Sequence, residues 1–418
     1  MKIAIVGGGI SGLLAAYLLA REHEITVYEA AAYAGGHTNT IRVDTPDSTH
    51  AVDTGFIVMN DRNYANFTRL LDRLGVARQP THMSFSVKAE GEDFEYSGTP
   101  RGLYCQRSNI VSVRFQRMVY DLLRFNRELR ALLRHEPAGV AGSESLADFL
   151  ARQRFSRAFV ERLIVPQVSA VWSADPHALH SFPVRFLAEF FSNHGMLGFR
   201  DRPRWSTIVG GSARYVEALT APFRERIRLN APVSSIARTP EHVELTVAGA
   251  APERYEQVVI ATHSDQALAM LTDASAREHE LLGAIAYKRN EAVLHTDSTL
   301  LPRRRAARAA WNFHLLREPK RVSTVTYYMN HLQRLEASED YCVTLNRTEA
   351  IDESKIIRRI EYWHPVFTHG AVAAQKAHAS ISSLQTRTHY AGAYWGWGFH
   401  EDGVVSALRA CAPFGAAL

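Results

Sequence analysis

The sequence predicts an α/β protein in which a doubly wound, parallel-sheet domain carries an inserted domain of mixed sheet and helices. Three observations predict this fold. The chain opens with a β-branched strand, Lys2–Val6, that leads through a glycine-rich turn into a helix. A second strand, Ile25–Tyr28, follows and ends in an acidic residue. Short apolar strands return much later, near Ile227, Val258 and Tyr390. Strands that alternate with helices form parallel sheets that are covered on both faces.

The first turn has the spacing G-x-G-x-x-G and predicts a dinucleotide-binding (Rossmann-like) site. Gly7 permits the tight turn, Gly9 permits the backbone to approach a pyrophosphate, and Gly12 permits the helix to pack closely on the strand. The first N–H groups of the helix, at Ile10 and Ser11, would hold the phosphate charge.

An acidic residue and a glycine pair follow this first helix. Glu29 ends the second strand, where it would accept hydrogen bonds from the ribose hydroxyls of the nucleotide. Gly35-Gly36-His37 and Thr40 then complete the pattern of an acid followed by G-G-x-x-x-T. In this pattern the chain resembles the FAD-dependent amine-oxidase-like superfamily. The resemblance implies that the segment runs beside the diphosphate and ribityl chain of FAD.

Later segments match the same superfamily and imply further FAD contacts. The family has a D-x-G turn near the flavin, a glycine-rich turn before a helix, and a strand whose valine contacts the adenine. It also has a strand that returns to the parallel sheet. Its last strand ends in A-G, and an acid-glycine pair then begins a helix that faces the flavin ring. The matching positions in this sequence are Gly55, Trp205, Val233, Ala261, Gly392, Asp402, Gly403 and Val404.

The aromatic run Tyr394–His400 departs from many amine oxidases, which carry an acid soon after the A-G pair. This run and the strand Leu294–Asp297 are similar to those of an uncharacterised bacterial branch of predicted NAD/FAD-binding proteins. Genes of that branch often stand beside genes for cyclopropane-fatty-acid synthases. No residue is assigned as the catalytic base, and the candidates for catalysis are Tyr394, Trp397, Trp311, Asn312, His295 and Tyr328.

Composition excludes several other classes of protein. A hydrophobic fraction of 46% and a charged fraction of 22% are typical of globular chains, and a net charge of +5 indicates no nucleic-acid partner. The 3 cysteines are far apart, and neither C-x-x-C nor H-E-x-x-H occurs, so we expect no disulfide and no metal site. The uncharged stretch Ile3–Ala20 is rich in glycine and makes a poor membrane span. We therefore expect a cytoplasmic protein.

We expect the FAD-binding domain to be assembled from residues 1–80, 200–275 and 376–418. The substrate (cap) domain would comprise residues 81–199 and 276–375, with an antiparallel sheet over the flavin. Only one G-x-G-x-x-G occurs, so no separate NAD(P)H domain is expected.

Two features of the expected substrate domain bear on a lipid substrate. In the helix expected at Ile110–His135, apolar residues and arginines fall on opposite sides at 100° per residue. Its arginine face is either a solvated surface or a surface that meets acidic lipid headgroups. The phenylalanine-rich stretch Phe182–Phe199 either fills the core or lines an apolar tunnel.

The expected function is that of an FAD-dependent oxidoreductase acting on a fatty-acyl or other lipid substrate. The reaction would be a desaturation, an oxidation or an isomerisation, with hydride transfer to flavin N5. We expect the FAD to be non-covalent, because no cysteine lies near Gly392–Gly403. One alternative is an amine oxidase with an aromatic cage formed by Tyr394, Trp395 or Trp397. The other is a non-catalytic lipid-binding escort protein on the same scaffold. Peripheral contact with an anionic membrane is also expected, whereas the oligomeric state stays open.

Overall fold

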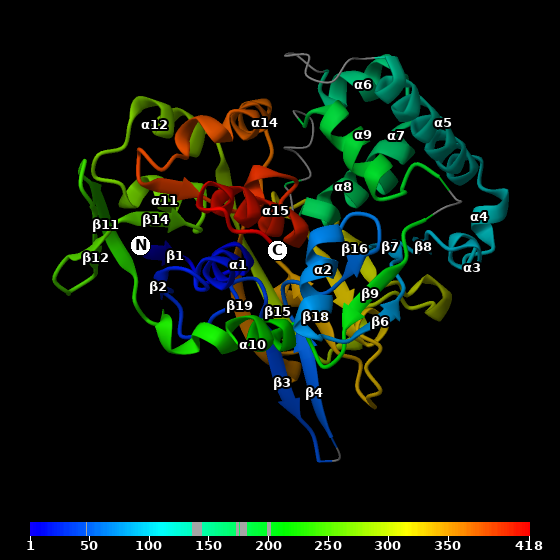
Figure 1. Cartoon of the computed structure of the whole chain (residues 1–418). Helices are drawn as coiled ribbons and strands as arrows, with labels where there is room; N and C mark the ends of the chain where they lie inside the picture. The colour runs from blue at the N-terminus through cyan, green and yellow to red at the C-terminus, as the bar shows by residue number, and fades with distance from the viewer. Residues whose placement is uncertain (47, 136–143, 173–174, 176–181, 199–201) are drawn as a thin grey trace.

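Two sheets organise the molecule. The computed structural model describes residues 1–46, 48–135, 144–172, 175, 182–198 and 202–418. A five-stranded sheet lies at the left of Figure 1, a seven-stranded sheet begins near its centre, and a group of helices lies at the upper right. This arrangement confirms the predicted fold: a doubly wound α/β part with an added region of mixed sheet and helices. The predicted domain boundaries themselves stay a prediction.

The five-stranded sheet is parallel throughout, as expected for a doubly wound domain. Ile3 and Ile5 pack on one face of the sheet, while Ala4 and Val6 pack on the other face. Because both faces are covered, the central strands Lys2–Val6 and Gln257–Ile260 are apolar along nearly their whole length. In sheet order the strands are β10 (Ile227–Arg228), β2 (Glu24–Tyr28), β1 (Lys2–Val6), β14 (Gln257–Ile260) and β20 (Thr388–Tyr390).

Seven helices surround this sheet. On the first face they are α1 (Ile10–Leu19), α2 (Ala65–Leu74), α10 (Ala213–Thr220) and α15 (His400–Cys411). On the second face they are α11 (Ser264–Met270), α12 (Ala276–Gly283) and α14 (His369–Lys376). A three-stranded antiparallel sheet packs on that second face, with strands β11 (Val233–Arg238), β12 (Val243–Val247) and β13 (Glu253–Tyr255).

The seven-stranded sheet corrects two expectations. It is not wholly antiparallel, because β16 pairs in parallel with β7, a strand from a much earlier part of the chain. Its longest strand, β19, was not predicted, because its sequence lacks the polar–apolar alternation that marks a half-buried strand. Since β19 is an edge strand, it tolerates Pro365. In sheet order the strands are β19 (Ile356–Val366), β15 (Ala286–His295), β18 (Cys342–Leu345), β17 (Val325–Tyr328), β16 (Trp311–Leu315), β7 (Phe85–Ala89) and β8 (Glu95–Ser97).

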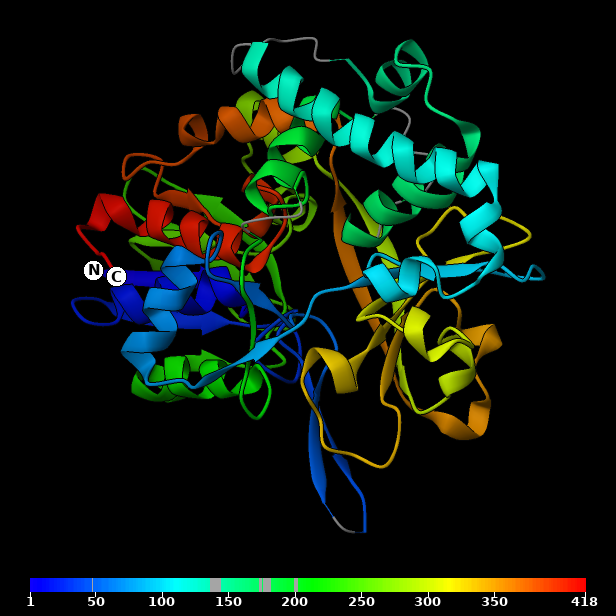
Figure 2. The same ribbon diagram turned by 90° about the vertical axis from the view of Figure 1, so that its right-hand side faces the viewer.

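Two small sheets contribute to the region between the large ones. The hairpin of β3 (Thr40–Asp44) and β4 (Thr49–Asp53) projects away from the body of the molecule (Figures 1 and 2). The other small sheet has the order β5-β9-β6, with β5 (Met59–Asn60), β9 (Trp205–Ile208) and β6 (Arg78–Thr81).

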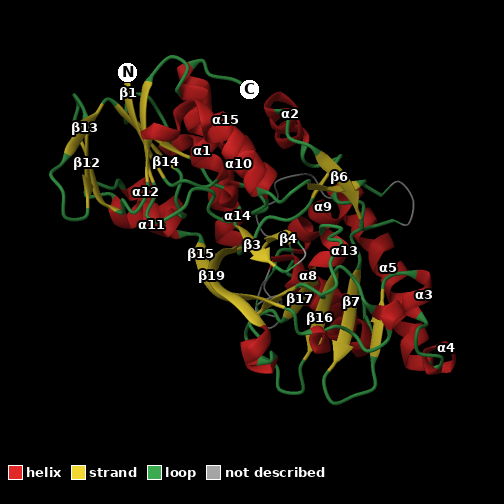
Figure 3. Ribbon diagram, turned by 90° about the horizontal axis from the view of Figure 1, so that it is seen from below, coloured by secondary structure: helices red, strands yellow, loops and turns green. Residues whose placement is uncertain are grey.

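Short and long helices pack beside the seven-stranded sheet (Figure 3). The helix expected at Ile110–His135 is divided, because Ser112 takes an extended backbone conformation between two helices. No helix within the described ranges is both long enough and apolar enough to cross a bilayer. The helices of this region are α3 (Pro100–Leu103), α4 (Ser108–Val111), α5 (Val113–His135), α6 (Leu146–Arg152), α7 (Arg157–Phe159), α8 (Val165–Trp172), α9 (Val184–Asn193) and α13 (Met329–Leu332).

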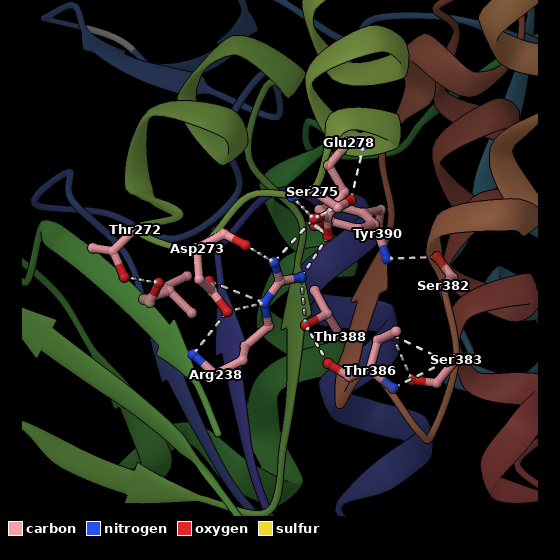
Figure 4. Close-up of polar contacts among 11 residues, drawn as sticks. Arg238, Thr272, Asp273, Ser275, Glu278, Ser382, Ser383, Thr386, Thr388 and Tyr390 are labelled. Atoms are coloured by element: carbon pink, nitrogen blue, oxygen red, sulfur yellow. Dashed lines mark hydrogen bonds and ion pairs between the residues drawn. The ribbon is translucent and has the colours of Figure 1, made fainter. Parts of the chain in front are cut away.

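A partly buried arginine, Arg238, ties the three-stranded sheet to α12 and to β20 (Figure 4). Arg238 donates hydrogen bonds to Asp273 and to both carboxylate oxygens of Glu278, at 2.5 and 2.9 Å. Tyr390 donates to the same carboxylate at 2.5 Å. Burial alone would raise the pKa of Glu278, but the hydrogen bonds from Arg238 and Tyr390 outweigh burial and lower that pKa to about 2. The cluster therefore holds an ionised carboxylate in the interior of the protein.

Candidate functional site

A large cavity is lined by residues of both main sheets, and most of the predicted site residues lie on its wall. Its volume is about 1780 Å³, and its wall includes residues from β1, the start of α1, β9, β11, β19 and the loop before α15. The carboxyl ends of β1 and β14 meet at this cavity, which is where ligands bind on doubly wound sheets.

The glycine-rich turn has the geometry that its sequence predicts. Gly7 has φ +106°, and a Cβ there would lie 2.8 Å from the carbonyl oxygen of Ala261. A Cβ on Gly12 would lie 1.9 Å from the carbonyl oxygen of Gly7, so the start of α1 can pack here only without a side chain. A Cβ on Gly9 would instead meet nothing within 4 Å. The turn thus leaves free space directly in front of the first N–H groups of α1.

Glu29 is held at the edge of this space by two backbone groups. Its Oε2 accepts from the N–H of Gly8 and its Oε1 from the N–H of Ala31, each at 2.7 Å. Each carboxylate oxygen has a second lone pair, so both can still accept a ribose hydroxyl. The second glycine pair lies alongside, because Gly35 donates to the carbonyl of Gly8 at 2.7 Å.

Thirteen of the eighteen residues predicted to bind the cofactor line the cavity. They come from at least five separate stretches of the chain, which the parallel sheet and its helices bring to one wall. These residues are Gly7, Gly9, Ile10, Ser11, Glu29, Gly35, Gly36, His37, Gly55, Trp205, Val233, Ala261 and Gly392.

The other five predicted cofactor residues, Gly12, Thr40, Asp402, Gly403 and Val404, lie behind the wall and support it. Thr40 donates to Asp53 at 2.5 Å, and the same carboxylate accepts from the N–H of Ser212 at the start of α10. Asp402 accepts from the N–H of Phe399 at 2.9 Å and so caps α15.

Gly403 and Val404 bring α15 against α1. The carbonyl of Gly403 accepts from the Ser11 hydroxyl at 3.0 Å, and a Cβ on Gly403 would lie 2.9 Å from Ile10. Val404 is buried in the core beneath the sheet. We therefore revise the expected direct contacts of these residues to packing roles, and place His400 on the cavity wall at the N-terminus of α15.

The part of the cavity away from the glycine turn is aromatic and apolar. Phe190 and Phe191 of the phenylalanine-rich stretch line it, whereas Phe182 and Phe186 lie in the core beside Trp172. Phe199 lies outside the described residues. The described part of the stretch therefore contributes both to the cavity wall and to the core. Further apolar wall residues are Phe85, Leu103, Val119, Leu122, Leu163, Val171, Trp172, Phe367, Trp397 and Phe399.

Comparison with known proteins decides the family. The model of the flavin-containing amine oxidoreductases matches residues 10–299, which is more than half of the chain. The chain belongs to this family. The predicted family and the predicted FAD cofactor are confirmed.

Its relatives have diverse substrates. A mitochondrial protoporphyrinogen oxidase from Nicotiana tabacum is 30% identical over 195 residues, which are 44% of this chain and 35% of the relative. The matched part thus spans about a third of the length of that relative. A putrescine oxidase double mutant, redesigned in its cofactor binding, has a TM-score of 0.69 at 14% identity, with 99% of both chains covered. A CLA-producing fatty acid isomerase from P. acnes has a TM-score of 0.70 at 16% identity, with 99% of this chain and 98% of that chain covered.

Two features of the cavity itself are suited to binding FAD. The free space at Gly9 faces the N-terminus of α1, which suits a diphosphate. Two buried polar atoms on the wall, Nε2 of His37 and Oη of Tyr394, have no hydrogen-bond partner within the described protein. Buried polar groups are normally paired, so both atoms point to a ligand in the cavity.

Three of the predicted catalytic candidates line the cavity of the oxidoreductase and three do not. Tyr394, Trp397 and Trp311 are on the wall. His295, Asn312 and Tyr328 are absent from it. Within the part of the chain described, no group of three or more His, Cys, Asp or Glu side chains is arranged to hold a metal ion.

The three residues that are not on the wall lie on strands β15, β16 and β17 of the seven-stranded sheet. Nε2 of His295 lies 2.7 Å from the Thr344 hydroxyl, and the ring accepts from the N–H of Asp297. Asn312 accepts from Ser86 at 2.8 Å and is fully buried. Tyr328 donates to Asp340. These bonds occupy the polar groups of the side chains, so we no longer consider them as catalysts.

Sequence reasoning predicted His37 but missed His263 and His364, which lie near it on the cavity wall. His37 lies 5.3 Å from His364 and 6.4 Å from His263, measured between ring centroids, and it stacks on Tyr362. Burial lowers the pKa of His37 and of His263 to about 4, and that of His364 to about 3. These rings are therefore neutral near pH 7. His364 and Tyr362 were missed because they lie on the unpredicted strand β19.

Each acidic residue on the described cavity wall has a hydrogen-bond or ion-pair partner. Glu29 is bound by two backbone N–H groups, and Asp61 pairs with Arg204 at 2.9 Å. Glu361 pairs with Arg289 and accepts from the indole of Trp363. Glu29, Asp61 and Glu361 are the acidic residues of this wall. None of them is left unpaired for a positively charged ligand.

Proposed function

We propose that this FAD-dependent oxidoreductase acts on a fatty-acyl or other lipid chain. The observation that carries the proposal is the character of the wall opposite the glycine turn. It is built from phenylalanine, tryptophan, leucine and valine side chains, and its histidines are neutral. An apolar chain gains about 0.8 kcal/mol for each methylene that leaves water, so such a wall favours a hydrocarbon ligand.

The same wall disfavours a charged amine. A buried ammonium group needs an anionic partner, because an unpaired charge is costly in an apolar site. The acids on the wall, Glu29, Asp61 and Glu361, already have partners. A hydrocarbon requires no such partner, which agrees with the fold shared with a fatty acid isomerase.

In this reaction the protein's own residues position the substrate and exclude water. FAD, when bound at the glycine turn, supplies a two-electron acceptor for a hydride from the substrate. Trp397 packs between Phe186 and Phe190, and its carbonyl accepts from the indole of Trp172 at 3.1 Å. This aromatic layer would hold an acyl chain against the flavin and keep water away from it.

An amine oxidase is the second candidate function, and one observation favours it. Tyr394 and Trp397 both line the cavity and both flank the loop before α15, so two rings are present for an aromatic cage. Trp395 packs on His378 instead and is not on the cavity wall. An amine that binds in its neutral form would need no anionic partner in this site. The escort alternative is weaker, since the complete glycine turn has no purpose in a protein that never binds FAD.

Anaerobic spectroscopy of the purified holoenzyme separates these functions. Oleate or linoleate is expected to bleach the flavin absorbance. If the hydride returns to the substrate in an isomerisation, linoleate, which has two double bonds, is expected to yield conjugated-diene absorbance in the ultraviolet. Putrescine and benzylamine are expected to leave both signals unchanged. Bleaching by an amine together with no spectral change from any acyl lipid would overturn the lipid proposal.

A matched pair of variants tests the wall itself. Phe190→Ala opens the cavity, whereas Phe182→Ala removes a phenylalanine from the neighbouring core. We expect Phe190→Ala to change the preferred acyl chain length, and Phe182→Ala to lower thermal stability without changing that preference. Equal effects of both variants on chain-length preference would contradict the placement of the acyl chain.

A further inference from the structure

The junction of α4 and α5 exposes more apolar surface than any other part of the described molecule. Eleven large hydrophobic side chains are exposed among the described residues, and the five most exposed all lie between positions 110 and 123. Val113 and Val111 reach 84% and 81% exposure, which is unusual for side chains on well-formed helices. Ile110, Tyr120 and Leu123 complete this set, which we call the α4–α5 patch.

The α4–α5 patch lies at the periphery of the protein. α4 and α5 are at the right-hand edge in Figure 1 and at the lower right in Figure 3, and α5 crosses the face turned to the viewer in Figure 2. Ser112 separates the two helices and brings Val111 and Val113 to the turn between them. The α4–α5 patch therefore lies on the outside of the molecule.

Arginines surround the α4–α5 patch. Arg107 and Arg114 flank its tip and are exposed, and neither side chain has a hydrogen bond or ion pair with the described residues. Along the outer face of α5 the exposed residues after Leu123 are Arg127, Arg130 and Arg134. The one fully buried acid of the helix, Asp121, points inward, where it binds Arg124 and the N–H of Ser156. The outward charge around the α4–α5 patch is thus positive.

This arrangement agrees with the sequence-based picture of the helix, in which apolar residues and arginines lie on opposite sides, and adds exposed apolar residues to the basic side. Val113, Tyr120 and Leu123 share the outward stripe with arginines, while Phe115 and Leu129 face the core. An apolar tip with basic residues around it is the pattern of a segment that enters the headgroup region of an anionic bilayer.

The α4–α5 patch also adjoins the cavity. Leu123 is 48% exposed and at the same time lines the cavity wall, together with Val119, Leu122 and Asn126 of the same helix. On α5 the cavity-facing stripe lies directly beside the outward stripe. An apolar surface thus continues from the outside of the protein, past Leu123, into the space that would hold the acyl chain.

We propose that the α4–α5 patch docks the protein on the surface of an anionic bilayer, with the tip Ile110–Val113 inserted among the headgroups and the arginines on the phosphates. This inference rests on the proposed lipid substrate for its biological sense, but the binding itself does not depend on turnover. An acyl chain drawn from the bilayer would then pass Leu123 into the cavity without crossing water.

Sedimentation with vesicles tests the docking. The full-length holoenzyme is mixed with vesicles of phosphatidylcholine alone, or of phosphatidylcholine and phosphatidylglycerol in equal amounts, at low and at high salt. We expect binding to the mixed vesicles at low salt and at least tenfold less to the neutral ones. No binding to either kind of vesicle would overturn the docking, but would leave the proposed function standing if acyl lipids still reduce the flavin.

Two matched pairs of variants locate the surface. Val111→Asp/Val113→Asp is expected to reduce vesicle binding at least tenfold, whereas Leu384→Asp, at an exposed apolar residue elsewhere, is expected to have no effect. Arg107→Glu/Arg114→Glu and Arg224→Glu/Arg226→Glu change the net charge equally at different exposed sites. Only the first charge-reversal pair is expected to weaken binding. Equal weakening by both pairs would show a general charge effect and overturn the assignment of the patch.

A second copy of the chain is the competing occupant of the α4–α5 patch. Sedimentation velocity without vesicles distinguishes it. We expect the wild type and Val111→Asp/Val113→Asp to have the same oligomeric state. Dissociation of a wild-type dimer by this variant would show that the patch is an interface between copies, and would overturn the membrane assignment.

Discussion

The glycine turn and the aromatic wall form the two ends of one cavity, yet they are built by different means. At the glycine turn the backbone itself makes the site, and an added Cβ at Gly7 or Gly12 would collide with backbone atoms at 2.8 and 1.9 Å. At the aromatic end the site is made by side chains from elements such as α8, α9 and β19, and Phe190 of α9 packs against neighbouring rings edge-on, tilted or stacked at centroid distances of 3.9 to 6.4 Å. Backbone collisions tolerate no substitution, whereas ring packing tolerates many. The difference indicates why one family holds one cofactor and many substrates.

The largest expected effect contrasts two glycines of the same turn. Gly12→Val forces a side chain into the carbonyl of Gly7 and is expected to prevent folding or to abolish FAD binding altogether. Gly9→Ala places its methyl group in free space, so the apoprotein should fold with an unchanged melting temperature. It should nevertheless retain much less flavin, because the methyl group occupies space that the diphosphate needs. Thermal unfolding and flavin content measure the two effects, and normal flavin content in Gly9→Ala would contradict the placement of the diphosphate.

Acid is expected to have the second largest effect, and it acts on the neutral histidines around the cavity. Burial lowers the pKa of His37, His194 and His263 from 6.5 to about 4. Between these values the unfolded chain binds protons that the folded protein does not, so stability falls as the pH falls from 6.5 toward 4. Each such histidine contributes a loss of about 1.4 kcal/mol per pH unit in this window. Melting temperatures of the holoenzyme should be level above neutral pH and drop below it; a level profile down to about pH 5 would contradict burial of these rings as neutral groups.

The third effect is a loss of stability on the nucleotide side of the molecule, caused by disrupting the ionic cluster of Arg238. Arg238→Leu leaves the carboxylate of Glu278 buried without its cation, which typically costs about 3–5 kcal/mol. Arg238→Leu/Glu278→Gln removes the stranded charge and should recover part of this loss. Denaturant unfolding of both variants gives the two free energies of unfolding. If the double variant were less stable than Arg238→Leu, the cluster would not owe its importance to the buried charge.

On the aromatic side, Trp397→Ala is expected to change turnover more than flavin content. The indole packs with Phe186 and Phe190 over the substrate space, far from the glycine turn in the sequence. Loss of well-fitted apolar contacts with a substrate commonly reduces kcat/KM by about tenfold or more. The bound flavin should stay near the wild-type amount. Flavin loss in parallel with activity would show that the ring only supports the fold.

The nucleotide end was predictable because its requirements are visible in single letters of the sequence. The turn needs glycine at set positions and an acid after the next strand, and these requirements identified Gly7, Gly9, Gly12 and Glu29. The helix expected at 404–411, with its N-terminus toward the flavin, corresponds to α15, which already begins at His400; Asp402 caps that helix and does not line the cavity.

The aromatic end was less predictable because its residues converge only after folding. His194, His263 and His364 come from three separate elements, and no local pattern marks a histidine that will face a cavity. His295 was chosen for its place in a recurring strand motif, but Thr344 and Asp297 on neighbouring segments engage its ring. Strand β19 escaped notice since its polar and apolar residues do not alternate, and the cavity residues Tyr362 and His364 lie on it.

The smallest expected effect lies where the two ends of the cavity meet, at Tyr394. Its ring covers the position where a Cβ of Gly392 would lie, the residue lines the cavity, and its buried hydroxyl has no hydrogen-bond partner among the described residues. Tyr394→Phe keeps the ring and removes only the hydroxyl, so the apoprotein should be as stable as the wild type or slightly more so. If a ligand pairs with the hydroxyl, its loss costs about 0.5–1.5 kcal/mol, which is roughly a fivefold weaker Kd for FAD or a fivefold higher KM for the substrate. Tyr390→Phe is the matched control: it removes a hydroxyl that donates to Glu278, so it should lower apoprotein stability and leave both ligand constants unchanged. Fluorescence titration of the apoprotein with FAD, combined with steady-state kinetics, assigns the Tyr394 hydroxyl to the cofactor or to the substrate. A Tyr394→Phe protein that lost apoprotein stability as Tyr390→Phe does, with both constants unchanged, would place the hydroxyl in the fold and not in the site.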